Sequence, residues 1–417
     1  MNKLRLALEK LYENVEKQQI RYSKLRETYE EKFGDSDLHY FSTPGRTEIG
    51  GNHTDHNHGR VLAASINLDS IAVAARNSEN SVVLYSEGYD SSFIVDLSQL
   101  NIVQEEQETT YALIRGIAAR FKQLGYQTGG VNICMTSDVL PGSGLSSSAS
   151  IEVLIGSIFN VLYNENRIAP EELAKIGQYA ENEFFGKPSG LMDQIACAVG
   201  GIISIDFKDP HKPFVNKVNF DFNTQNYNVL VVDTGGNHVD LTEDYAAVPA
   251  EMKAVASAFN AEVLRDISKE QFSAGIPQLR KNLGDRSVLR SLHFISENER
   301  VAGQVASLES DDLCNFLNLV KASGNSSFKW LQNIYSTKNI QEQGMTLALA
   351  LTEKFIDKIQ AGACRVHGGG FAGTILVFLP ENYVSEYVNE IEQVFEKGCT
   401  TVLSIRQHGT VYLNTFF

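Results

Sequence analysis

The chain has little cysteine and no long apolar run. Its five cysteines are far apart and form no C-x-x-C pair, so a disulfide framework is not expected (Cys134, Cys197, Cys314, Cys364 and Cys399). No stretch of eighteen apolar residues predicts a membrane span. The first residues, MNKLRLALEKLYENVEKQQ, soon become charged and lack the apolar core of a signal peptide. These absences predict a cytoplasmic protein with reduced thiols.

An excess of positive charge is missing as well. The chain carries 36 Lys and Arg residues against 51 Asp and Glu residues, a formal net charge of −15. This balance argues against a nucleic-acid surface and against binding to anionic membranes. With 417 residues, of which 43% are hydrophobic, the chain is long enough for two globular domains.

A Gly–Ser stretch stands out, although it lacks the G-K-[ST] of a Walker A loop. Val131, Ile133 and Met135 alternate with polar or small residues, which predicts a strand, and an apolar helical face follows over 151–162. Between them lies PGSGLSSSAS (141–150). Glycines let a backbone approach a ligand closely, and the start of a helix offers free N–H groups to an anion. The stretch is either a cradle for the phosphates of a nucleotide or a serine-capped helix after an ordinary turn.

A candidate catalytic carboxylate lies in the segment ENEFFGKPSGLMDQ (181–194). Asp193 comes just after a Gly-containing turn and at the start of an expected short helix. There the helix dipole would keep its carboxylate ionised, as a general base requires. Alternatively, Asp193 serves only as a cap of that helix. Glu181, on the preceding helix, is either a ligand for a metal ion or a residue on a solvated face.

Two further stretches combine glycine with polar groups. In RVHGGGFAG (365–373), three consecutive glycines before a strand imply that the backbone lies close to a ligand or to a neighbouring strand. In GRTEIGGNHTDHNHG (45–59), three histidines and Asp55 fall close together. They suit a zinc site poorly, since no H-E-x-x-H helix frames them. Contacts to a sugar or phosphate, and structural polar groups of a loop, are the other interpretations.

In their order and spacing, these four stretches resemble the motifs of the GHMP small-molecule kinases, and within them of the galactokinases. The family's first motif, G-R-x-N-x-I-G-E-H-T-D-Y-N, is similar to GRTEIGGNHTDHN, and its P-x-G-x-G-L-S-S-S-A is similar to LPGSGLSSSA. AENEFFGKPSGLMDQ resembles the segment with the catalytic aspartate, and ACRVHGGGFAG resembles the third motif. VDTGGNHVDLTEDY resembles the segment with the sugar-contacting tyrosine. The resemblance extends from about Phe41 to beyond Gly373.

The resemblance implies a role for each matching residue. Asp193 would accept or orient the proton of the anomeric hydroxyl, and Arg46 would stabilise the charge of the transferred group. The residues implied for the sugar hydroxyls are Asn52, His53, Asp55, Gly190 and Tyr245. Those implied for the phosphates of ATP are Pro141, Gly142, Ser143, Gly144, Leu145, Ser146 and Ser147. Those implied for Mg²⁺ are Ser148 and Glu181.

The resemblance also implies the architecture and the reaction. We expect an α+β fold with a ribosomal-S5-like domain over 1–210, a ferredoxin-like domain over 211–417 and the active site in the cleft between them. The expected reaction transfers phosphate from ATP, with Mg²⁺, to the C1 hydroxyl of galactose, giving galactose 1-phosphate and ADP. A monomer is the favoured assembly. A non-catalytic sensor of galactose and ATP is an alternative, disfavoured because Asp193, Arg46 and the Gly–Ser stretch are all present.

Departures from the family pattern bear on the substrate. In the family a glutamate at the position of Asn52 contacts the sugar near its 6-hydroxyl. An amide there would remove this negative charge, and the site would then tolerate a carboxylate at C6. A C6-modified galactose such as galacturonate is therefore the alternative substrate. The departures are Asn52 where the family has Glu, Glu48 where it has Asn, His56 where it has Tyr, Gly50 where it has Ile, and His367 where it has Thr.

Overall fold

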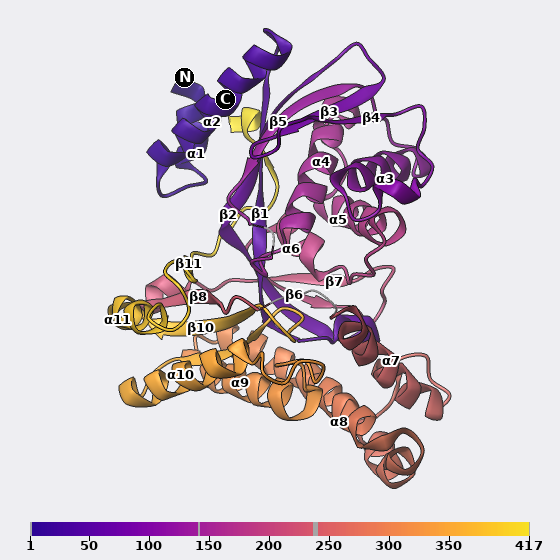
Figure 1. Ribbon diagram of the computed structural model, residues 1–417, viewed down its shortest axis with the longest axis vertical. Coiled ribbons are helices and arrows are strands. Elements are labelled where there is room, and N and C mark those ends of the chain that lie inside the picture. Colours follow the sequence, from indigo (N-terminus) through magenta and orange to yellow (C-terminus); the bar gives the residue numbers. More distant parts are fainter. Residues whose placement is uncertain (1, 141, 237–240, 417) are drawn as a thin grey trace.

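The computed structural model describes residues 2–140, 142–236 and 241–416, and these form two β-sheets covered by helices (Figure 1). The first sheet has the order β12-β1-β2-β5-β3-β4, with β6 paired to β2 and β7 to β6. Its strands are β1 (His39–Gly50), β2 (Arg60–Arg76), β3 (Ser81–Ser86), β4 (Phe93–Asp96), β5 (Val131–Ser137), β6 (Ile202–Asp206), β7 (Phe214–Val218) and β12 (Val411–Tyr412). The second, antiparallel sheet has the order β11 (Thr400–Leu403), β8 (Tyr227–Asp233), β10 (Thr374–Pro380) and β9 (Ala363–His367).

Helices cover both sheets, and the α+β architecture expected from the sequence is confirmed. The helices of the first half are α1 (Asn2–Glu9), α2 (Val15–Phe33), α3 (Thr110–Gln123), α4 (Ser147–Asn164), α5 (Pro170–Tyr179) and α6 (Met192–Val199). Those of the second half are α7 (Thr242–Ala258), α8 (Lys269–Glu309), α9 (Leu313–Ser326), α10 (Gly344–Ile359) and α11 (Glu381–Ile391). Within the described ranges, no helix combines the length and the apolar character needed to cross a membrane.

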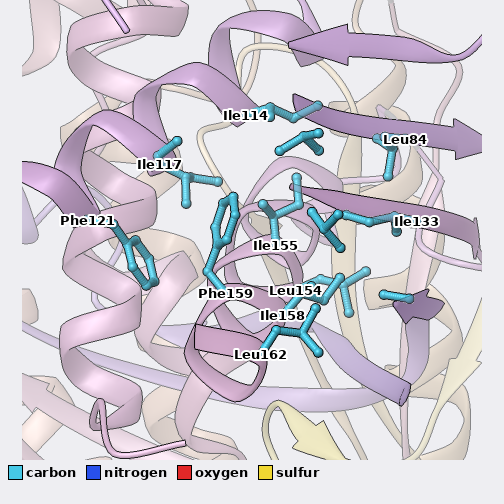
Figure 2. Packing of buried hydrophobic residues seen from close by; sticks show 14 of the residues in the cluster. Leu84, Ile114, Ile117, Phe121, Ile133, Leu154, Ile155, Ile158, Phe159 and Leu162 are labelled. Atoms are coloured by element: carbon cyan, nitrogen blue, oxygen red, sulfur yellow. The ribbon is translucent and has the colours of Figure 1, made fainter. Parts of the chain in front are cut away.

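The first sheet buries both of its faces, as the sequence of β2 requires. Ala72 and Ala74 belong to the core under α3 and α4, whereas Ile71 and Val73 belong to the core under α2. This division follows from the alternation of side chains along a strand. Figure 2 shows the core under α3 and α4, where one apolar face of α4 meets α3 and the strands. The predicted strand–loop–helix order over 130–165 is confirmed by β5 and α4.

The two sheets also share a core, which fixes one half of the molecule against the other. Leu62 and Ile66 of β2 pack in the same apolar cluster as Val231 of β8 and Phe378 of β10. The domain boundary at residue 210 stays a prediction. In the structure β7 still pairs with β6 of the first sheet, and β12 returns to that sheet near the end of the chain.

A buried carboxylate ties the N-terminal helices and the C-terminal segment to the first sheet. Asp69 of β2 is fully buried, and its Oδ1 accepts a hydrogen bond from Arg21 of α2 at 2.7 Å. Its Oδ2 accepts hydrogen bonds from Arg406 at 3.0 Å, from Ser42 at 2.6 Å and from Tyr12 at 2.5 Å. Because two arginines face one carboxylate in the interior, removal of its charge would leave Arg406 uncompensated and Arg21 with only the more distant Asp138, at 3.5 Å.

We therefore expect Asp69→Asn to lower the free energy of unfolding by about 3–5 kcal/mol, the usual cost of breaking a buried ion pair. The matched control is Glu30→Gln. Glu30 accepts from Arg26 Nε at 2.6 Å but its side chain is 38% exposed, so the loss should stay below about 1 kcal/mol. Urea unfolding followed by circular dichroism measures both, and equal losses would contradict the prediction.

Candidate active site

An ion pair between Arg46 of β1 and Asp193 of α6 lines a cavity of about 330 Å³. Arg46 Nε and Nη2 donate to the two carboxylate oxygens of Asp193 at 2.8 and 2.6 Å. Arg46 is buried, whereas 30% of the Asp193 side chain is exposed. Burial by itself would raise the pKa of Asp193, but the charge and hydrogen bonds of Arg46 act against it and the pKa is lowered. The cavity therefore contains an ionised carboxylate.

The Gly–Ser stretch forms the loop between β5 and α4, and it is attached to this ion pair. The backbone N–H of Arg46 donates to Leu145 O at 3.1 Å. This approach requires glycine at position 45, because a Cβ there would lie 2.7 Å from the same oxygen. Ser146 has a left-handed backbone, with φ of 61°, and its hydroxyl donates to Asp193 Oδ2. Since that hydroxyl does not cap α4, the alternative of a serine-capped helix is wrong.

The residues predicted for ATP divide into two groups. Four of them line the cavity, namely Gly142, Gly144, Ser146 and Ser147. Ser147 begins α4, so the free N–H groups of the first helical turn lie beside the cavity. The Ser143 hydroxyl donates instead to Leu140 O at 2.6 Å, and the Leu145 side chain is buried in the core shared by the two sheets. Pro141 lies outside the described residues.

The residues predicted for Mg²⁺ meet at the edge of this cavity. Ser148 Oγ donates to Glu181 Oε1 at 3.2 Å. Glu181 is only 2% exposed, so its assignment to a solvated face is wrong. It lies in a π-helical turn, η3 (Ala180–Phe185), where a continuous α-helix was expected, and such turns are frequent at functional sites. Hydroxyl and carboxylate oxygens are the donors that Mg²⁺ prefers, so the two residues fit this ion.

The clustered histidines of 45–59 do not form a zinc site. No group of three or more His, Cys, Asp or Glu side chains that could hold a metal ion occurs in the described part of the chain. His53 Nε2 lies 2.8 Å from Gly369 O, and because a carbonyl only accepts, this nitrogen carries the proton. Burial lowers the pKa of His53 to about 4. His53 therefore serves as a neutral donor that attaches its loop to the glycine run.

Asp55 and Gly190 come together from two separate parts of the chain, whereas Tyr245 lies against the glycine run. Asp55 Oδ2 would lie 1.7 Å from a Cβ at position 190, so only glycine fits beside this carboxylate. Tyr245 lines the cavity, and its Oη donates to Gly370 O at 2.8 Å. Burial raises the pKa of Tyr245 to about 12, which keeps the phenol protonated. Asp55, Gly190 and His53 lie outside the lining of this cavity, and their contacts to a sugar stay predictions.

The Asn52 side chain lies in the protein interior, whereas the resemblance implied that it contacts a sugar hydroxyl. The side chain is fully buried and hydrogen-bonded within the protein, where its Nδ2 donates to Glu48 Oε1 at 3.1 Å and to Gly368 O at 2.6 Å. Its Oδ1 accepts from Asn333 at 2.8 Å. The expectation that this substitution removes a charge is corrected: Asn replaces Glu at 52 and Glu replaces Asn at 48, and these side chains are in contact. Glu48 in turn accepts a hydrogen bond from buried Arg365 at 2.8 Å.

Lys187, His367 and Thr374 also line the cavity, and none of these polar side chains was predicted to bind a ligand. The backbone N–H of Glu48 donates to His367 Nε2 at 3.2 Å, so the proton is on Nδ1, which donates to Thr374 Oγ1 at 2.9 Å. Burial, with Arg46 nearby, holds the pKa of His367 well below its usual range. No spacing in the sequence indicates these contacts, although position 367 was visible as a departure from the family pattern.

Three histidines whose pKa values are lowered predict an acid-sensitive fold. The pKa values of His53, His293 and His367 are all lowered by burial, below the value of about 6.5 in the unfolded chain. The unfolded chain therefore binds more protons below that pH, and the free energy of unfolding falls as pH decreases from 7 to 5. Each histidine contributes up to about 1.4 kcal/mol per pH unit. The free energy of unfolding is measured by urea titration at several pH values between 5 and 7. It should fall less steeply with decreasing pH in His367→Thr than in the unmodified protein, and an unchanged dependence on pH would contradict this role.

Comparisons with known proteins agree with this geometry. The GHMP kinases N terminal domain matches residues 112–201, and the galactokinase galactose-binding signature matches residues 27–76. Galactokinase of Lactococcus lactis subsp. lactis (strain IL1403) is 28% identical over 385 residues, which are 90% of this chain and 92% of the relative. Galactokinase of Glaesserella parasuis serovar 5 (strain SH0165) is 29% identical over 374 residues, which are 88% and 92% of the two chains.

Solved structures give the same assignment. The crystal structure of Lactococcus lactis galactokinase complexed with galactose has a TM-score of 0.81 and 25% identity, covering 94% of this chain and 99% of that chain. A crystal structure of mevalonate kinase, with a TM-score of 0.62 and 17% identity, shares the fold over 88% of this chain and 99% of that chain. In sequence and in fold the chain is therefore similar to the GHMP small-molecule kinases and, among them, to the galactokinases, which supports a sugar kinase enzyme.

Proposed function

We propose that the protein transfers the terminal phosphate of ATP to the C1 hydroxyl of galactose, giving galactose 1-phosphate and ADP. The observation that carries the proposal is the Arg46–Asp193 pair, which lines the same cavity as the Gly–Ser loop. The Lactococcus lactis galactokinase that resembles this chain was crystallised with galactose, which supports galactose as the sugar.

In this proposal Asp193 orients the C1 hydroxyl and accepts its proton. Its lowered pKa supports an ionised carboxylate at neutral pH, and the Ser146 hydroxyl holds one of its oxygens in place. Arg46 stabilises negative charge on the attacking oxygen and on the transferred group. Phosphoryl transfer depends mainly on such alignment and charge compensation, so fixed groups of this kind suit the reaction.

The phosphates of ATP would lie against the Gly–Ser loop and the start of α4. Backbone N–H groups there suit anions, and glycine at 142 and 144 lets the backbone come close to them. Ser148 Oγ and Glu181 Oε1 would hold Mg²⁺. When bound, the ion would neutralise charge on the phosphates. The cytoplasmic location and the monomeric state stay predictions.

The exchange at positions 48 and 52 favours galactose over a sugar with a carboxylate at C6. Relative to the family pattern, the carboxylate stands at position 48 instead of position 52, and the two side chains are hydrogen-bonded to each other. The number of carboxylates in the region is therefore unchanged. Glu48 is buried and its charge is compensated by Arg365 at 2.8 Å. The exchange therefore adds no positive charge that would attract a second carboxylate on the sugar.

A coupled assay of ADP release tests the function. Purified protein is offered galactose, galacturonate, N-acetylgalactosamine and glucose, and turnover should be fastest with galactose. Asp193→Asn should lower kcat by about 10³-fold, as expected for loss of a proton acceptor, while calorimetry still detects galactose binding. No turnover with any sugar would refute the kinase and favour the sensor, and retained turnover in the variant would refute the role of Asp193.

Variants at the exchanged pair test the substrate argument. Asn52→Glu places two carboxylates side by side in the interior, so it should lower the free energy of unfolding by about 3 kcal/mol. Adding Glu48→Asn restores the family arrangement and should recover most of this loss. Arg365 Nε and Nη1 have no hydrogen-bond partner within the described ranges, so Arg365 has donors available for a carboxylate at position 52.

The double variant should also keep the galactose-to-galacturonate ratio of kcat/KM, because the charge of the region is unchanged. A ratio that moves by more than about tenfold would show that position 52 itself reads C6. Additive stability losses would show that the two positions are independent.

A further inference from the structure

A lysine occupies the position on Glu181 where the cation of the proposed reaction would bind. Lys187 lies just after the glycine that ends η3, and its backbone N–H donates back to Glu181 O at 3.1 Å. Its Nζ lies 3.0 Å from Glu181 Oε1. Lys187 lines the cavity together with Ser148 and Asp193, and 61% of its side chain is exposed. Lys187 therefore places a positive charge, on a long and partly exposed side chain, at the edge of the active site.

The two oxygens of Glu181 have different surroundings. Oε2 accepts hydrogen bonds from Ser189 Oγ at 2.6 Å and from Gln194 Nε2 at 2.9 Å, so the protein interior holds it. Oε1 is the oxygen shared by Ser148 Oγ and Lys187 Nζ. A divalent cation bound by Ser148 and Glu181 would therefore meet Lys187 on the same oxygen. Two cations cannot share that position without strong repulsion.

We propose that Lys187 is a phosphate-binding residue, which pairs with Glu181 in the free protein and moves to the phosphates of the nucleotide when a divalent cation takes Glu181 Oε1. The proposal rests on the kinase function proposed above. Lys187 and the Gly–Ser loop line one cavity, so the ammonium group needs only a change of side-chain rotamer to turn from the carboxylate to bound phosphate.

Charge compensation explains why the site needs such a residue. In the free protein each functional carboxylate has one cation, Arg46 on Asp193 and Lys187 on Glu181. The nucleotide brings several negative charges into a protein whose formal net charge is already −15. A released lysine supplies positive charge at the point where the phosphates enter, and an ammonium group is a suitable donor for phosphate oxygens.

The first experiment measures Mn²⁺ binding to the nucleotide-free protein by electron paramagnetic resonance, with Mn²⁺ as the probe for the magnesium position. Lys187→Met removes the competing charge and should tighten Mn²⁺ binding by about tenfold. Lys187→Arg keeps the charge and should bind Mn²⁺ like the unmodified protein. The matched control is Lys17→Met, since Lys17 also pairs with a carboxylate, at 3.1 Å, and is 57% exposed.

The second experiment measures turnover and ADP binding. Lys187→Met should lower kcat and weaken ADP binding at saturating Mg²⁺, both by about tenfold, with the KM for the sugar unchanged, and Lys187→Arg should keep both near the values of the unmodified protein. Unchanged Mn²⁺ affinity in Lys187→Met would overturn the competition, and unchanged kcat and ADP affinity would overturn the phosphate contact. Mn²⁺ binding needs no sugar, so failure of the kinase proposal in the sugar panel remains distinguishable from failure here.

Discussion

A row of alternating charges joins the two halves of the molecule, and the cavity depends on it. Asp193 of α6 pairs with Arg46 of β1, and two residues further along that strand Glu48 pairs with Arg365 of β9 in the second sheet. Arg46 and Glu48 lie on the same face because side chains alternate along a strand. Arg46, Glu48 and Arg365 are buried, so water does not screen their charges, and the neighbours in the row compensate them. Loss of one member would leave an uncompensated charge in the interior.

The loops around the cavity are attached to the same row. Asn52 donates both to Glu48 and to Gly368 O, which connects the histidine-containing loop to the glycine run. His367 accepts from the backbone of Glu48 and donates to Thr374. Lys187 and Glu181 add a second ion pair beside the first. Apart from Lys187, the cavity is therefore bounded by groups that are held in place before any ligand arrives, which is the arrangement that electrostatic catalysis requires.

Local pattern was sufficient for some elements and insufficient for others. The strand β5, the Gly–Ser loop and α4 follow from alternation, glycine content and helical spacing, and Asp193 does lie at the start of a short helix. The π-helical turn at Glu181 was not predictable, because its composition is that of an ordinary helix. Glu48 and Asn52 were both recognised as departures but were interpreted separately. The two residues are four positions apart at the end of a strand, and no sequence pattern indicates that their side chains are in contact.

The sequence by itself determined the resemblance to a family, the motifs and the residue types of the site, because these depend on order and spacing along the chain. Only the tertiary structure decided what each side chain contacts. Arg46 and Asp193 are 147 positions apart, and Glu48 and Arg365 are 317 apart. Whether Asn52 faces a ligand or the interior, and which oxygen of Glu181 is left for a cation, depend on such distant partners. Local propensity has no information about them, because burial and pairing arise only when the two sheets pack together.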